Sequence, residues 1–277
     1  MLWKRIATAI VLLPLVLFGL FRLPAHGIAM LIGGAVMVAS WEMSGLVGFK
    51  TRRLRWLYNF VILVGGVAGS LWVMQGNSIV VILMVALVWW IYAGIHLFRE
   101  KGDFGGIYGN VVGRSLAGLF IMVPTWLAFL SLYVIDTRHP LLILNVLILV
   151  WIADSFAYFV GRAVGRHKLA PAVSPGKSIE GVIGGLAGVV IVAMASNHYL
   201  WEFTGNSLLV WIAVSVATGA FSVVGDLTES IFKRRAGVKD SGHLLPGHGG
   251  MYDRIDALTS AIPLFALGWI LIQGVVK

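Results

Sequence analysis

The chain has 277 residues, of which 59% are hydrophobic and only 12% are charged, and its mean hydropathy is +0.91. Soluble domains carry about 25% charged residues, so this composition excludes an ordinary soluble protein and indicates a membrane protein. The absence of cysteine excludes disulfides and cysteine-ligated metals, and the net charge of +9 raises the question of an anionic partner.

Apolar stretches of about 20 residues recur along the chain, and that length matches a helix that crosses a bilayer. The first stretch follows Lys4 and Arg5, as in a signal peptide, but Phe21-Arg22-Leu23-Pro24 after it lacks a small-residue cleavage pattern, so we expect a retained helix. We predict an all-α polytopic membrane protein with about nine transmembrane helices. The predicted spans are 6–21, 25–47, 56–74, 78–98, 111–135, 140–161, 180–200, 207–231 and 256–275.

The distribution of Lys and Arg predicts the orientation of these helices. With the N-terminus in the cytoplasm, all but three of the 21 Lys and Arg residues fall on the cytoplasmic side, the exceptions being Arg22, Arg138 and Lys277. The positive-inside rule predicts such a bias. We therefore expect a C-terminus on the periplasmic or outer side of a bacterial cytoplasmic (inner) membrane. The net charge then reflects topology and contact with anionic headgroups, and nucleic acid is not expected as a partner.

No internal repeat or linker divides the chain into soluble domains. We predict an N-terminal region of about five transmembrane helices, 1–135, and a C-terminal catalytic region, 136–277, with cytoplasmic loops 162–179 and 232–255. The spans of the first region contain one acidic residue, Glu42. The acidic residues in or beside the later spans are Asp154, Glu180, Asp226, Glu229, Asp253 and Asp256. A charged group at membrane depth costs about 2.5–3.5 kcal/mol on insertion scales, so this concentration indicates a site.

Two carboxylate pairs flank the last cytoplasmic loop. Asp226 and Glu229 are three residues apart and share a helix face with Ser230, while Asp253 and Asp256 are again three apart at the start of the last span. Such pairs suit Mg²⁺, which takes a few carboxylates together with substrate phosphates. The alternative is that these acids only balance the basic residues of the helix ends, Lys233, Arg234 and Arg254. We favour the metal role for Asp226 and Asp253 and leave the other two acids open.

A basic, glycine-rich loop lies between the two pairs. Lys and Arg neutralise phosphate oxygens, and Arg does so with bidentate geometry. The run Pro-Gly-His-Gly-Gly at 246–250 predicts a tight irregular loop whose backbone N–H groups can approach a phosphate. Basic loops on this side of a membrane usually reflect only the positive-inside rule, but the density and order of these residues indicate a phosphate site.

The segment from Ser230 to Asp256 resembles the signature of the phosphatidate cytidylyltransferases (CDP-diacylglycerol synthases). That signature reads S-x-x-K-R, four residues, K-D, and then P-x-H-G-G-x-x-D-R-x-D. The matching positions are Ser230, Lys233, Arg234, Lys239, Asp240, Pro246, His248, Gly249, Gly250, Asp253, Arg254 and Asp256. A fixed pattern of this length is far more specific than a lone glycine motif.

Three shorter polar elements extend the resemblance upstream, at 154–158 (Asp-Ser-Phe-Ala-Tyr), 161–162 (Gly-Arg) and 174–181 (Ser-Pro-Gly-Lys-Ser-Ile-Glu-Gly). Family members more often have Lys-Lys-Thr where this chain has Gly176-Lys177-Ser178, so no role is carried over to Gly176. The first four spans resemble the family only in being hydrophobic.

The resemblance implies a reaction in which CTP and phosphatidate give CDP-diacylglycerol and diphosphate. The phosphatidate phosphate is already an anionic nucleophile, so the protein must bring two polyanions together and stabilise charge, which metal ions and a cationic clamp do. Mg²⁺ is the expected cofactor, and a second cation is left open. The acyl chains are expected to stay among the membrane lipids.

The resemblance also implies roles for individual residues. The implied catalytic residues are Asp226, Asp253, Lys239 and His248. The implied metal ligands are Asp226 and Asp253, with Asp256 and Glu229 as secondary candidates. The implied substrate-binding residues are Lys233, Arg234, Arg254, Lys177, Asp154, Tyr158, Ser230, Asp240, Gly249 and Gly250.

Two other functions stay open at this point. An intramembrane prenyltransferase is also helical and Mg²⁺-dependent, although the spacing of Asp226 and Glu229 does not give the expected D-x-x-x-D motif. An ion-coupled transporter could use Asp154 and Asp226 as ion sites, although transporter sites lie near mid-membrane and these polar residues gather at one surface. Homo-oligomerisation through the first spans is also left open.

Overall fold

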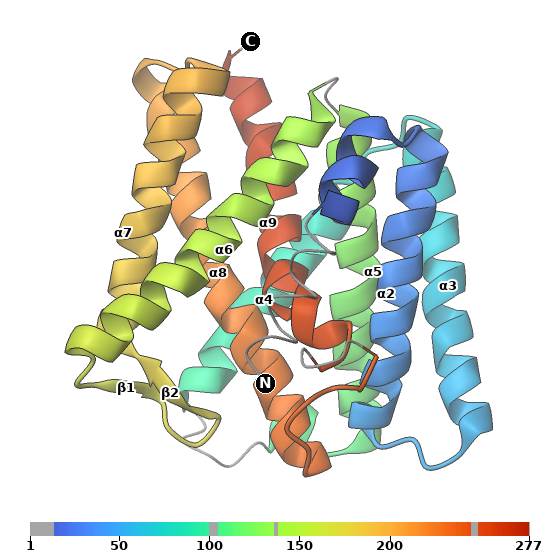
Figure 1. Ribbon diagram of the computed structural model, residues 1–277. Coiled ribbons are helices and arrows are strands. Elements are labelled where there is room, and N and C mark those ends of the chain that lie inside the picture. The colour runs from blue at the N-terminus through green and yellow to red at the C-terminus, as the bar shows by residue number, and fades with distance from the viewer. Residues whose placement is uncertain (1–13, 100–104, 136–137, 245–248, 277) are drawn as a thin grey trace. The chain divides into compact units, whose positions relative to one another are not determined.

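The structure is a computed structural model that describes residues 14–99, 105–135, 138–244 and 249–276. Nearly all of this chain is helical (Figure 1). After a helix at 14–22, the elements are α2 (Ala25–Val47), α3 (Arg52–Met74), α4 (Val80–Arg99), η1 (Gly106–Tyr108), α5 (Val111–Ile135), α6 (His139–Val164), β1 (Lys168–Ala170), β2 (Ser174–Ser178), α7 (Ile179–Ser196), η2 (Asn197–Trp201), α8 (Gly205–Ala236) and α9 (Tyr252–Val276).

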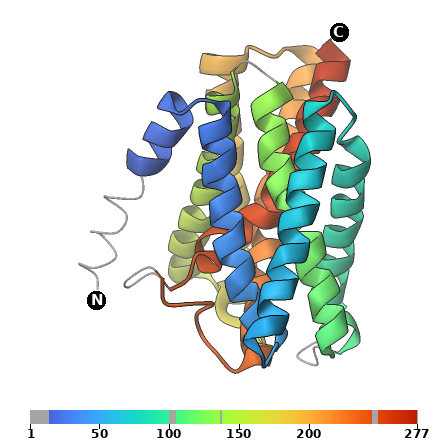
Figure 2. The ribbon, with the colours of Figure 1, turned by 90° about the vertical axis from the view of Figure 1, so that its right-hand side faces the viewer.

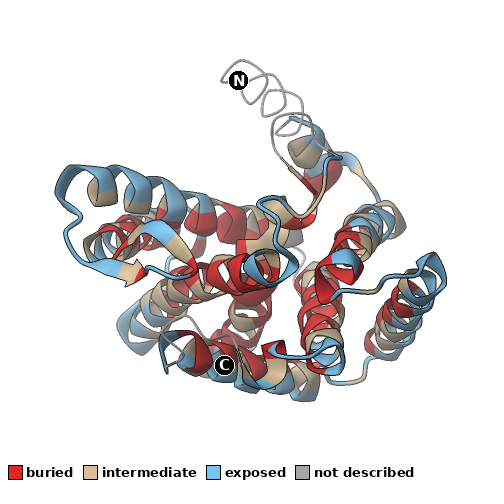
Figure 3. Ribbon diagram, turned by 90° about the horizontal axis from the view of Figure 1, so that it is seen from below, coloured by how far each residue is buried: buried red, intermediate tan, exposed pale blue. Residues whose placement is uncertain are grey.

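Eight of the described helices are long and apolar enough to cross a membrane, so the chain is a multi-pass membrane protein. Many of their large apolar side chains are exposed, as along α3, where a lipid environment would cover them. Figure 3 shows buried and exposed stretches alternating along the helices. The exposed apolar residues of α3 include Trp56, Leu57, Phe60, Val64, Leu71 and Trp72.

The chain forms two compact units that interleave along the sequence. Unit 1 contains residues 1–79, 104–143 and 231–256, and unit 2 contains residues 80–103, 144–230 and 257–277. Each unit therefore includes parts of both predicted regions, 1–135 and 136–277. The functional division of the chain between those two regions stays a prediction.

In unit 1, helices α2, α3 and α5 pack side by side, as Figures 1 and 2 both show. Tyr58 on α3 is buried and donates a hydrogen bond to the carbonyl of Ser115 on α5 (3.3 Å). Arg114 joins α5 to the end of α2, because its Nε donates to the Val47 carbonyl (2.9 Å) and its Nη1 to the Tyr108 carbonyl (2.8 Å). These bonds give the Arg114 guanidinium two acceptors, and they give the carbonyls of Val47 and Tyr108, at helix ends, a donor.

In unit 2, helices α6 and α7 approach each other at their backbones. A Cβ at Gly185 would come within 2.6 Å of the Ala153 carbonyl oxygen, and one at Gly181 within 2.7 Å of the Ala157 carbonyl oxygen. Small residues allow this approach, which supplies packing in a membrane where lipid tails compete with apolar side chains. The pair α6 and α7 carries the β1–β2 hairpin at its end.

The predicted spans agree closely with the helices. The spans 25–47 and 111–135 coincide with α2 and α5, and the all-α polytopic prediction is confirmed. The first predicted span, 6–21, lies mostly outside the described residues. The hairpin of β1 and β2 was not predicted, because residues 162–179 were expected to form only a loop; the strands pair antiparallel with Lys168 opposite Ser178 and Ala170 opposite Ser174.

Candidate functional site

The structure shows one cluster of polar residues in each unit. We call the first the Lys177 cluster; it lies in unit 2 and consists of Asp154, Lys177 and Asp226. We call the second the Asp253 cluster; it lies in unit 1 and consists of Glu42, Lys233, Ser241, Gly250 and Asp253.

The hairpin sets the position of Lys177. Ser178, the last residue of β2, is the N-cap of α7, and its side chain accepts a hydrogen bond from Gly181 N (3.2 Å). Glu180, in the first turn of α7, accepts from the backbone N–H groups of Arg166 (3.1 Å) and His167 (3.2 Å). A carboxylate near a helix N-terminus is also favoured by the helix dipole. Lys177 therefore lies in a paired strand, directly before the capped start of α7.

Lys177 forms an ion pair with Asp226 of α8, with 2.6 Å between Nζ and Oδ2. The two side chains keep 24% and 27% of their surface exposed, although the Lys177 Nζ atom itself is buried. Asp154 of α6 interacts electrostatically with both partners. One ammonium group thus faces two carboxylates from two helices, which gives a site that can bind either a metal ion or, through Lys177, a phosphate.

Tyr158 lies one helical turn after Asp154 on α6. It is 59% exposed, and its hydroxyl oxygen accepts a hydrogen bond from Arg162 Nη1 (3.2 Å). Residues four apart share a helix face, so Asp154, Tyr158 and Arg162 form a polar strip on a helix that is otherwise apolar. The predicted substrate-binding role of Tyr158 stays a prediction.

Asp253 is the most extensively bonded carboxylate of the predicted set. Its Oδ1 lies 2.7 Å from Lys233 Nζ, and its Oδ2 accepts from Ser241 N (2.8 Å), Ser241 Oγ (2.9 Å) and Gly250 N (2.8 Å). The side chain is only 6% exposed. Asp253 therefore fastens both ends of the loop 241–250 to the first turn of α9. The pairing with Lys233 is the charge balance that we had weighed against a metal role.

Two residues of the Asp253 cluster were not predicted. Glu42 accepts hydrogen bonds from Met251 N (3.0 Å) and Tyr252 N (2.8 Å), and Ser241 Oγ lies 2.9 Å from Glu42 Oε2. One signal marked Glu42, because it is the single acid within the early predicted spans and a buried carboxylate needs partners. Ser241 lies in the signature segment but outside its fixed positions, so no signal marked it.

The two glycines of the signature meet a steric requirement. Gly249 has φ +78°, a conformation that L-residues with side chains rarely adopt. A Cβ at Gly250 would collide with Glu42 Oε2 and Ser241 Oγ. The other three residues of the predicted tight loop, 246–248, lie outside the described residues, so that loop stays a prediction. Because Gly250 N–H donates to Asp253 here, phosphate contact by this backbone group stays a prediction.

The remaining predicted residues divide by exposure. Glu229 is fully buried and Ser230 nearly so on α8, while Asp256 is half-buried on α9, so each predicted carboxylate pair does lie on one helix. His248 lies outside the described residues. The predicted phosphate-binding residues Arg234, Lys239 and Arg254 are exposed, and so is Asp240, which was predicted to bind substrate.

The carboxylates could hold a cation to different degrees. In the described ranges, no three His, Asp or Glu side chains come together as a ready metal site. Mg²⁺ keeps several waters and needs only one or two protein carboxylates beside substrate phosphates, so two acids are enough. Asp226 fits this role with a lysine ammonium already at its oxygen, whereas Asp253 must release donors first.

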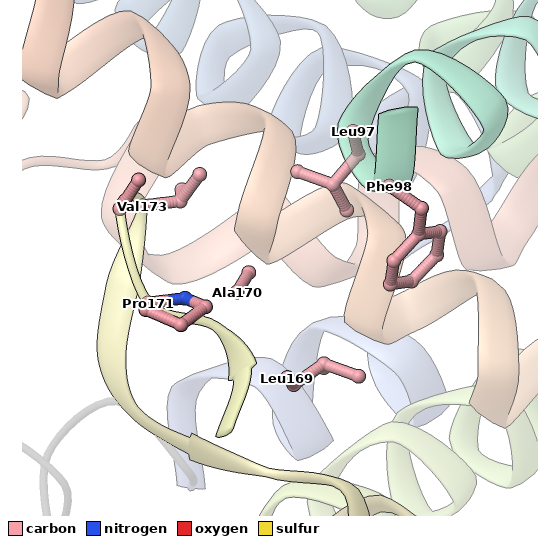
Figure 4. A pocket seen from close by; sticks show the side chains of 7 residues that line it. Leu97, Phe98, Leu169, Ala170, Pro171 and Val173 are labelled. Atoms are coloured by element: carbon pink, nitrogen blue, oxygen red, sulfur yellow. The ribbon is translucent and has the colours of Figure 1, made fainter. Parts of the chain in front are cut away.

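A cavity of about 650 Å³ lies beside the hairpin in unit 2 (Figure 4). It is lined by Leu97 and Phe98 at the end of α4 and by residues 169–173. Its lining is almost entirely apolar, and it includes no member of either cluster. The cavity therefore offers no groups for phosphate or metal chemistry.

Comparison with known proteins gives one consistent result. The sequence profile of the Cytidylyltransferase family matches residues 3–271. The chain is 43% identical to the phosphatidate cytidylyltransferase of Pseudomonas aeruginosa over 269 residues, which is 96% of each protein. It is 40% identical to the phosphatidate cytidylyltransferase of Haemophilus influenzae, over 96% of this chain and 98% of that protein. The match extends through the early helices, which our sequence analysis had likened to the family only in hydrophobicity. The chain therefore belongs to the Cytidylyltransferase family.

Proposed function

We propose that this protein transfers the cytidylyl group of CTP to phosphatidate, giving CDP-diacylglycerol and diphosphate. The observation that carries the proposal is the identity of 43% and 40% to two phosphatidate cytidylyltransferases over 96% of the chain. The paired lysines and carboxylates of both clusters support it, because they supply the charges that a reaction between two polyanions requires.

The chemistry is an in-line displacement at the α-phosphorus of CTP. A phosphatidate phosphate oxygen forms the new O–P bond while the bond from the α-phosphorus to the bridging oxygen breaks, and diphosphate leaves with that electron pair. No side-chain nucleophile is needed, so positioning and charge neutralisation account for catalysis. Lys177, Lys233 and the exposed Arg234, Lys239 and Arg254 are the residues proposed to hold phosphate oxygens.

Mg²⁺ is the proposed cofactor, and it would supply charge neutralisation at the transferring and leaving phosphates. Asp226 and Asp253 are its proposed principal ligands, with Glu229 and Asp256 as secondary ones. The position of each carboxylate pair on one helix, Asp226 with Glu229 on α8 and Asp253 with Asp256 on α9, supports these assignments, and a metal ion would compete with Lys177 and Lys233 for the carboxylate oxygens. Binding of metal at Asp226 would free Lys177 for a phosphate oxygen.

We also propose the cellular setting. The Lys and Arg distribution supports a cytoplasmic N-terminus, and the bacterial relatives support the inner membrane. The loops that carry the signature would then face the cytoplasm, where CTP is found. Phosphatidate would keep its acyl chains in the bilayer and present its headgroup from the side.

The test is conversion of labelled CTP and phosphatidate by the purified protein in lipid nanodiscs, with Mg²⁺ and with EDTA. We expect CDP-diacylglycerol and diphosphate in equal amounts with Mg²⁺ and none with EDTA. An inactive folded wild-type protein would overturn the proposed function. Full activity in EDTA-treated protein would overturn the cofactor while leaving the reaction in place.

A further inference from the structure

We infer that Glu42 is a positioning residue for the reaction: it holds the end of the signature loop so that Asp253 keeps its orientation. This inference rests on the proposed function, because Asp253 must take part in that reaction for its orientation to matter. Glu42 lies on α2, far from the signature in sequence, and none of the family's signature positions includes it.

The carboxylate of Glu42 meets three polar groups from the other end of the chain. Met251 N donates to Oε1 (3.0 Å), Tyr252 N donates to Oε2 (2.8 Å), and the Ser241 hydroxyl oxygen lies 2.9 Å from Oε2. The two backbone groups belong to the start of α9, where N–H groups have no partner within the helix. A carboxylate at this place satisfies them and complements the helix dipole.

Ser241 links Glu42 to Asp253. Its hydroxyl oxygen lies 2.9 Å from Glu42 Oε2 and 2.9 Å from Asp253 Oδ2, and a hydroxyl has one proton to donate. The same oxygen accepts from Asp253 N (3.3 Å). A displacement of Glu42 therefore changes how Ser241 bonds to Asp253, and the effect reaches the carboxylate through a single side chain.

Gly242 and Gly250 pack closely against the Glu42 side chain. A Cβ at Gly242 or at Gly250 would collide with the Glu42 carboxylate. Glu42 itself is only 8% exposed. Glu42→Gln keeps the size of the side chain, so it tests the hydrogen bonds without creating a cavity. The glutamine amide nitrogen would face an N–H group or the Ser241 hydroxyl in place of an acceptor.

The first measurement is steady-state kinetics of Glu42→Gln in nanodiscs. We expect kcat to fall about 10- to 100-fold, the loss typical when a residue that orients a functional ligand is removed, while KM for CTP changes by less than about threefold. Ser40→Ala is the matched control, because Ser40 is a fully buried residue of α2 that hydrogen-bonds to Asn59 and not to the loop. Its kcat should equal that of the wild type.

The second measurement reads the loop without using activity. The chain has no cysteine, so Met251→Cys gives a single thiol beside Glu42. We expect maleimide to label it about tenfold faster when Glu42→Gln is added, as the loss of one or two hydrogen bonds would allow. The Ser40→Ala background should leave the labelling rate unchanged.

The outcomes separate this inference from the proposed function. Faster labelling together with a lower kcat supports the positioning role. An unchanged labelling rate, or faster labelling with full kcat, overturns it. A kcat loss that merely follows the folded fraction, measured by size-exclusion chromatography and melting temperature, also overturns it. A wild-type protein that forms no CDP-diacylglycerol while Glu42→Gln still speeds labelling would sink the proposed function and keep Glu42 as the loop's anchor.

Discussion

The two polar clusters hold their aspartates in opposite ways. Asp253 has four bonds from Lys233, Ser241 and Gly250, and its side chain is 6% exposed. For Asp226, the described residues supply one ion-pair partner, Lys177, and its side chain is 27% exposed. Both residues are acids near span ends that are predicted to face the cytoplasm, and we predict the same role for both from the sequence.

The difference shows that one side chain of the signature, Asp253, can serve both the structure of its loop and the proposed chemistry. A carboxylate held by several donors organises the loop around it, whereas one with a single partner can exchange that partner for a ligand. We therefore expect Asp253 to couple stability with activity and Asp226 to affect activity alone.

The largest expected effect compares Asp226→Asn with Asp253→Asn. Both variants should lose activity by about 10³-fold, since losing metal-held charge stabilisation removes several kcal/mol from the transition state. Only Asp253→Asn should also destabilise the protein, by about 1–3 kcal/mol, because its amide leaves buried donors without an acceptor. Its melting temperature should fall accordingly. Activity assays and differential scanning fluorimetry in nanodiscs check both halves. Equal melting temperatures would break the distinction.

The second comparison removes the lysines. Lys233→Met leaves the buried Asp253 without its counter-ion and should destabilise the protein by about 3 kcal/mol. Lys177→Met breaks a more exposed pair and should cost less than about 1 kcal/mol, while kcat still falls. Thermal unfolding of the two variants measures the contrast, and a larger loss in Lys177→Met would reverse our ranking of the clusters.

The smallest expected effect concerns the hairpin. Ser178→Ala removes the N-cap of α7 and should cost about 1 kcal/mol, with a severalfold drop in kcat because Lys177 precedes it. Thr51→Ala removes the N-cap of α3 and serves as a control, with a comparable loss of stability and unchanged kcat. If both variants keep full kcat, the hairpin does not position Lys177 for the reaction.

The fold was largely predictable because lipid imposes a length and a composition on each helix. Hydropathy marks the lipid boundary and not the helix end, which is why α3 starts at Arg52, before the predicted span 56–74, and α8 runs to Ala236, beyond the predicted span 207–231. The hairpin escaped prediction because its strands have only three and five residues and lie in a basic loop.

The site was predictable only where its residues are close in sequence. The high density of acidic and basic residues in the signature marked them as candidates. In the structure, Asp226 and Asp253 each pair with a lysine. The partner of each could not be read from spacing. Glu42 shows why, since its contacts depend on the three-dimensional fold and no local pattern encodes them.

The separation between Glu42 and its partners has a consequence for biogenesis. Glu42 lies 199 residues before Ser241 and 210 before Tyr252. The ribosome therefore makes Glu42 long before it makes these hydrogen-bond partners. The hairpin and α7, by contrast, use neighbours only 13 or 14 residues apart. The contacts between Glu42 and the loop 241–250 thus form late in synthesis. A nascent chain that ends before α9 lacks the Met251 and Tyr252 partners of Glu42.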